Sequence, residues 1–145
     1  MTTTSTPPTT AIAATIPVRL YLSDTDPEDP RVEQRIVTGW PVAPGLAINV
    51  THEYGQRLDG RYSLTHLPSG QALARRLCAR HVDQAAVAAI ATGVDWSADV
   101  EQVIADERTR PLHPGRADWD WCGYDEFCRA EAYPRPDSPT YPSSR

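Results

Sequence analysis

The sequence predicts one α+β domain in which an antiparallel sheet of about four strands is followed by three helices packed on one of its faces. Apolar residues alternate in the first half of the chain and recur at helical spacing in the second, and 145 residues suffice for one core. Residues 1–16 and 133–145 are rich in Thr, Pro or Ser and predict disordered tails. The expected domain is residues 17–110, with residues 111–132 docked on it.

Two strands are expected before residue 41. Residues 17–23 place apolar side chains on alternate positions, with Arg19 and Tyr21 between them, which is the period of a half-buried strand. Residues 31–40 are ambiguous between strand and helix. The Asp-Pro pair before them resembles a helix start, whereas their β-branched residues favour a strand. We expect a strand here, and the helix stays open as the alternative.

The Asp59-Gly60 pair predicts a tight hairpin turn, because both central residues of such a turn adopt positive φ. A turn at these two residues places Glu53 opposite His66, with His52 next along the same strand; a longer loop would change this register. A carboxylate facing an imidazole is the minimum arrangement for acid–base catalysis. The structural alternative is that His66, at a strand end, binds the turn that follows it.

Three helices are predicted after this hairpin. The first begins with Ser69 as N-cap and carries an apolar stripe through Leu73 and Leu77. The second runs over residues 83–92, with an acidic cap at its start and a glycine after its end. The third starts near Trp96, which we expect to be buried between helices. These helices would cover one face of the sheet.

A candidate zinc site consists of three cysteines and one histidine: Cys78, His81, Cys122 and Cys128. Cys78 and His81 share one side of the predicted helix, and three thiolates with one imidazole suit tetrahedral zinc. The six-residue separation of Cys122 and Cys128 is wider than a usual zinc knuckle. In the structural alternative Cys78 is a core residue and His81 interacts with a helix end. We therefore expect no cofactor and keep zinc as an alternative.

Positive charge is concentrated in residues 51–81, which contain five arginines and only two acidic residues. The arginines are Arg57, Arg61, Arg75, Arg76 and Arg80. Such a set could bind an acidic protein or a phosphate backbone, or could be a solvated surface. The net charge of −5 argues against binding to bulk nucleic acid, since affinity there comes from neutralised phosphates.

Aromatic residues are concentrated in the predicted docked segment. They are Trp119, Trp121, Tyr124 and Phe127. Such a cluster either packs on the domain or is held for a partner, and we expect packing.

The stretch RYSLTHLPSGQAL reads as a strand ending in Thr-His, an apolar residue, then Pro-Ser-Gly and a helix. It resembles small proteins encoded by actinobacteria and their phages and mobile elements. The Gly39-Trp40 pair and residues 94–97 fit the same resemblance, which spans about residues 17–108. The resemblance implies no activity and no catalytic residues.

The favoured function is that of a small, non-enzymatic accessory protein that binds another protein. A nucleic-acid-binding regulator that uses the arginines is the alternative, and a zinc-binding or acid–base hydrolytic protein is the second. Pro7 and Pro8 interrupt the N-terminal stretch, which also lacks the basic start of a signal peptide. Prolines and glycines likewise break the longest uncharged run, so we expect a cytoplasmic protein that does not span a membrane. The sequence does not determine the oligomeric state.

Overall fold

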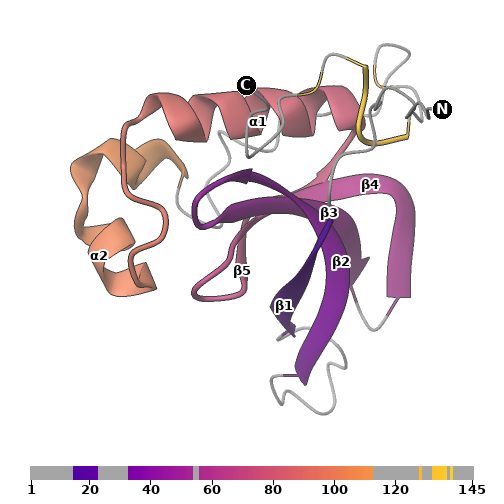
Figure 1. Ribbon diagram of the computed structural model, residues 1–145, viewed down its shortest axis with the longest axis horizontal. Coiled ribbons are helices and arrows are strands. Elements are labelled where there is room, and N and C mark those ends of the chain that lie inside the picture. The colour runs from indigo at the N-terminus through magenta and orange to yellow at the C-terminus, as the bar shows by residue number, and fades with distance from the viewer. Residues whose placement is uncertain are drawn as a thin grey trace, which may run out of the picture.

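The computed structural model describes residues 15–22, 33–53, 56–112, 128, 132–136 and 138. Its main feature is a five-stranded antiparallel sheet in which each strand pairs with the next one along the chain. The strands are β1 (Ile16–Leu22), β2 (Glu33–Ala43), β3 (Leu46–Glu53), β4 (Gln56–His66) and β5 (Gln71–Leu77). They are followed by α1 (Ala79–Ala91), α2 (Val100–Ala105) and the 3-10 helix η1 (Glu107–Leu112). Figure 1 shows α1 lying along the curved sheet, with α2 beyond the C-terminal end of α1.

The α+β class and the antiparallel sheet are confirmed, whereas the expected four strands and three helices are wrong in detail. The first two strands form where alternation and β-branched residues predict them. β1 and β2 pair in register, with Val18 opposite Val37. The ambiguous residues 31–40 therefore contribute a strand and not a helix. Within the described residues, no helix is long and apolar enough to cross a membrane.

The Asp59-Gly60 pair does not form the turn between β3 and β4. Glu53 pairs with Gln56, so β4 has already begun three residues before Asp59. The ladder then skips residues 59–61, which form a bulge inside β4. Gly60 has a φ of 82°, which a residue with a side chain rarely adopts. The sequence signal for positive φ was correct, but it marks a bulge and not a turn.

The first predicted helix is wrong, because residues 71–77 form the edge strand β5. Its pairing with β4 shifts register twice. These bulges bury Leu73 and Leu77 while Arg75 and Arg76 stay exposed. The resulting pattern of two buried and two exposed residues imitates helical spacing. Arg76 has a φ of 62°, which ends regular strand geometry before the chain enters α1.

The two α-helices differ from the predicted second and third helices mainly at their starts. α1 begins after Cys78, whose side chain caps it, and Asp83 is a buried residue inside the helix and not its cap. Gly93, with a φ of 74°, follows its end as predicted. α2 begins only at Val100, with Asp99 as its N-cap.

The main core lies between the sheet and α1. Its strand residues include Leu46, Ile48, Leu64 and Leu77, and its helix residues include Val82, Ala85, Ala86 and Ala89. The small alanine side chains let α1 approach the sheet closely. A smaller apolar cluster of Val18, Leu20 and Ala47 is separate from this core.

Trp96 is buried in the connection between α1 and α2, as the sequence predicts, with 2% of its surface exposed. Its indole Nε1 donates a hydrogen bond to the Ala89 carbonyl at 3.0 Å. Gly45 lies so close that a Cβ there would be 2.2 Å from the Trp96 carbonyl oxygen, and its φ is 87°. The turn between β2 and β3 therefore requires glycine at this position.

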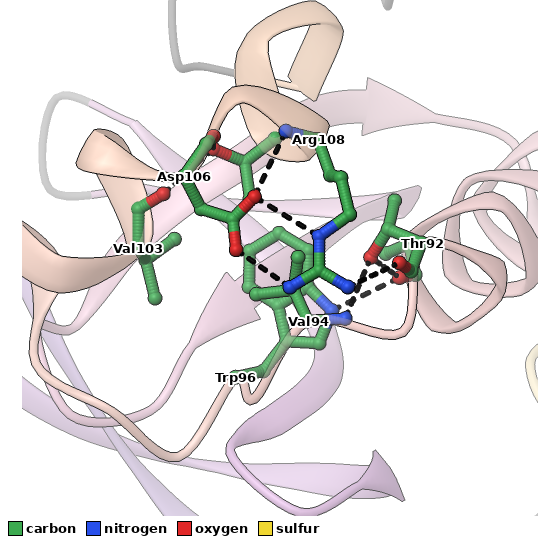
Figure 2. A network of polar contacts seen from close by, with 8 residues as sticks. Thr92, Val94, Trp96, Val103, Asp106 and Arg108 are labelled. Atoms are coloured by element: carbon green, nitrogen blue, oxygen red, sulfur yellow. Dashed lines mark hydrogen bonds and ion pairs between the residues drawn. The ribbon is translucent and has the colours of Figure 1, made fainter.

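Arg108 fastens η1 to the end of α1 (Figure 2). Its Nη2 lies 2.7 Å from the Asp106 carboxylate, and its Nη1 donates to the Thr92 carbonyl at 3.3 Å. Hydrogen bonding to Arg108 lowers the pKa of Asp106 to about 2. The positive charge also lies where the carbonyl groups of α1 end, which is the favourable end of the helix dipole for a cation.

The start of the predicted tail 133–145 packs on the domain at Tyr133. Tyr133 is 6% exposed, and its ring centroid lies 4.9 Å from that of Trp40 and 5.6 Å from that of Tyr62. The Tyr133 N–H donates to the Tyr62 hydroxyl at 3.0 Å. Residues 1–14 and 139–145 of the predicted tails lie outside the described residues.

Candidate functional site

The predicted acid–base pair is not brought together. Observed pairing places His66 opposite Leu46 and Glu53 opposite Gln56, at the two ends of the β3–β4 ladder. Seven residues of strand separate these positions, or about 23 Å at ~3.3 Å per residue. The expected pairing depended on a turn at residues 59 and 60, which the bulge replaces.

His66 instead joins two loops. Its Nε2 lies 2.9 Å from the Ala98 carbonyl oxygen, and its Nδ1 lies 2.8 Å from Ser69 Oγ. A carbonyl only accepts, so Nε2 carries the hydrogen and Nδ1 accepts from the serine hydroxyl. Burial lowers the pKa of His66, which keeps the ring neutral. The ring thus connects the turn after β4 to the segment before α2, close to its predicted structural role.

Glu53 is also held by structural partners. Its buried carboxylate accepts hydrogen bonds from the Arg76 guanidinium, with Nε 2.8 and 2.7 Å from the two oxygens. The Arg76 N–H donates to Thr51 Oγ1 at 3.2 Å, and Thr51 Oγ1 lies 2.8 Å from Ser63 Oγ. His52, the third candidate of this group, is half-buried, with Nδ1 3.0 Å from a carbonyl oxygen of its own strand.

The five predicted arginines are distributed over three elements and do not form one helical face. Arg57 and Arg61 belong to β4, Arg75 and Arg76 to β5, and Arg80 to α1. Arg57 Nε lies 2.6 Å from Asp59 Oδ1, and the Arg76 guanidinium is paired with Glu53. Part of the predicted positive charge is therefore neutralised by acidic residues of the same fold.

Three of the four predicted metal ligands meet at the start of α1. His81 Nδ1 lies 3.1 Å from Cys78 Sγ and 3.4 Å from Cys128 Sγ, and the three atoms are all within 4.8 Å of one another. Cys78 is 1% exposed and Cys128 is 5% exposed. Cys122 lies outside the described residues. Cys78 and His81 do not share a helix as predicted, because Cys78 is the N-cap of α1 and the residues before it form β5; their side chains meet through the cap.

The outer face of α1 is a feature that the sequence analysis did not single out. Val87 is 54% exposed and Ile90 is 40% exposed, and Ala88 and Ala91 are exposed beside them. The opposite face of the same helix builds the core. The absence of charge could have indicated this face, because residues 84–94 contain no charged side chain. We call Val87, Ala88, Ile90 and Ala91 the apolar face of α1.

No protein-family model, curated protein or solved structure matches this chain. The functional argument therefore rests on the geometry of its own residues. The aromatic candidates Trp119, Trp121, Tyr124 and Phe127 lie outside the described residues, so their docking stays a prediction.

Proposed function

We propose that this chain is a small, non-enzymatic accessory protein that binds another protein through the apolar face of α1. The observation that carries the proposal is the exposure of Val87 and Ile90, which are three residues apart and therefore lie on the same side of the helix. Exposure of neighbouring large apolar side chains is unfavourable in water, and clustered exposure of this kind marks interaction sites.

The composition of this face defines the chemistry of the partner. Ala88 and Ala91 are small, so a partner backbone can approach the helix closely between the two larger side chains. The face lacks cations, and phosphate binding depends on them. An apolar stripe on another protein, such as the buried side of an amphipathic helix, fits it better than nucleic acid. Nucleic acid would need the arginines of β4, β5 and the start of α1.

The test compares the double variant Val87→Glu/Ile90→Glu with the control Gln102→Glu. Gln102 is exposed on α2 and not on α1, so the control adds charge without altering the apolar face. Partners captured from a native host by wild type would be purified, and their affinities measured against all three proteins. We expect the double variant to bind at least ~100-fold more weakly and the control to bind normally. Melting temperatures should agree within a few degrees.

Three outcomes would contradict this function. Unchanged affinity of the double variant would exclude the apolar face of α1 as the interface. A large loss of stability in that variant would show that another part of the chain already covers the face. Loss of binding in Arg75→Glu/Arg80→Glu but not in the double variant, with steep salt dependence, would favour the nucleic-acid alternative.

A further inference from the structure

We propose that Cys78, His81 and Cys128 bind one zinc ion, which fastens the chain at residue 128 to the start of α1. This site lies at the N-terminal end of the helix and does not depend on the apolar face proposed above. The first support is that both sulfur atoms converge on one ring nitrogen, His81 Nδ1, at 3.1 and 3.4 Å. A cation between the three atoms accepts a lone pair from each.

The spacing of the three atoms fits tetrahedral zinc. Zinc bonds of ~2.3 Å to sulfur and ~2.0 to 2.1 Å to nitrogen place tetrahedral ligand atoms ~3.6 Å apart for a sulfur–nitrogen pair and ~3.8 Å for two sulfurs. The observed sulfur–nitrogen distances are slightly shorter, and all three atoms lie within 4.8 Å. The two sulfur–nitrogen pairs need shifts of a few tenths of an ångström to admit the ion, and the sulfur–sulfur distance, which is at most 4.8 Å, must come to ~3.8 Å.

The ligand types select the metal. Thiolate and imidazole suit zinc, whereas calcium and magnesium require oxygen ligands. The N-terminus of α1 carries partial positive charge that stabilises the negative charge which two thiolates bring to the site. The backbone N–H of His81 also donates a hydrogen bond to Cys78 Sγ at 3.4 Å, which holds this sulfur in place. Both cysteines are buried, so their sulfur atoms would hold the ion away from bulk solvent.

Binding of zinc here would complete the attachment of the C-terminal chain. Cys128 comes from far along the sequence, and the residues that follow it already contact the domain. The Tyr133 N–H donates to the Tyr62 hydroxyl, and Ser138 Oγ donates to Asp83 Oδ2 at 2.7 Å. The metal would therefore attach the chain to α1 before the described contacts of Tyr133 with β4 and of Ser138 with α1. The described residues supply three ligands, and water or another side chain completes the tetrahedron.

The test uses the full chain, reduced and free of metal, with zinc alone as the probe. Zinc binding is measured by competition with a chromophoric chelator, and cobalt replaces zinc to report thiolate coordination by absorption. The variants are Cys78→Ser and Cys128→Ser, with His52→Gln as a control distant from the cluster. Serine is a strong N-cap, so Cys78→Ser removes the ligand and retains the cap of α1. Circular dichroism confirms folding of each protein.

We expect one zinc per chain in wild type and in the control, and affinity at least ~100-fold lower in either serine variant. Cobalt should give a thiolate charge-transfer band in wild type that weakens in both serine variants. Removing zinc from wild type should accelerate amide hydrogen exchange in residues 128–138. Absence of zinc binding by reduced wild type, or wild-type affinity for zinc in both serine variants, would overturn the proposal. So would a Cys78–Cys128 disulfide, seen as the loss of two hydrogens in the intact mass, in a chain that binds no zinc after reduction.

Discussion

His66 and His81 are both held close to polar side chains, but their surroundings differ in one decisive respect. Each ring nitrogen of His66 has one partner of the matching kind, the Ser69 hydroxyl on one side and the Ala98 carbonyl on the other. A single nitrogen of His81 faces the sulfurs of Cys78 and Cys128. The oxygen partners of the first ring are those of a structural histidine, whereas the two sulfurs beside Nδ1 of the second ring are of the type that binds zinc. Residue type alone does not separate these roles, whereas the chemistry of the neighbouring atoms does.

The largest expected effect lies in the His66 region, where Trp96 packs edge-on against the ring with centroids 6.4 Å apart. We expect Trp96→Ala to lower the free energy of unfolding by ~3 to 5 kcal/mol, because it removes a fully buried indole. Urea denaturation of metal-free protein measures this. His81→Ala under the same conditions should cost less than ~1 kcal/mol, since His81 is half-buried. Equal losses in the two variants would remove the distinction between the regions.

A smaller loss is expected when His66 itself is removed. His66→Ala removes a buried ring and leaves the half-buried Ala98 carbonyl and Ser69 hydroxyl without these hydrogen bonds, at a cost of ~2 to 4 kcal/mol. Zinc affinity should stay the same, because the ring takes no part in the cluster at α1. Urea denaturation and zinc titration of the same sample test both statements. A variant with normal stability and impaired zinc binding would reverse the roles assigned to the two histidines.

Local patterns predicted the elements that are regular. Alternation in residues 17–23 and the β-branched residues of 31–40 indicated strands, and Gly93 marked the end of α1. β5 was missed because its two bulges bury Leu73 and Leu77 with exposed residues between them, which is also a helical pattern. Local spacing cannot separate these two cases without the partner strand.

The candidate site was predictable in its residues but not in its assembly. Cys78 and His81 are neighbours on the chain, so their proximity follows from local geometry. The approach of Cys128 depends on how the C-terminal chain crosses the domain, and no short-range pattern encodes that. The Glu53–His66 pairing failed because Glu53 pairs with Gln56, so β4 begins before residues 59 and 60 and the register of the whole hairpin differs from the expected one.

The smallest predicted effect is the pH dependence of stability that His66 contributes. Burial lowers the pKa of His66 from its ordinary 6.5, with Asp99 and the Ala98 carbonyl only partly opposing this effect. The unfolded chain therefore binds a proton at His66 at higher pH than the folded chain does. Stability from this group is fully present above pH ~6.5 and is lost as the pH falls toward the folded pKa.

The free energy of unfolding cannot fall by more than about 1.4 kcal/mol per pH unit through this group, because only one proton is bound. We expect His66→Gln, whose amide can donate and accept but does not titrate, to lose less stability than wild type between pH 7 and pH 5. Urea denaturation in a chelating buffer at each pH excludes any contribution from metal at His81, and the other histidines are common to both proteins. Identical pH profiles would mean that the folded ring accepts a proton as readily as the unfolded one. In that case the hydrogen bonds of His66 would not require the neutral form.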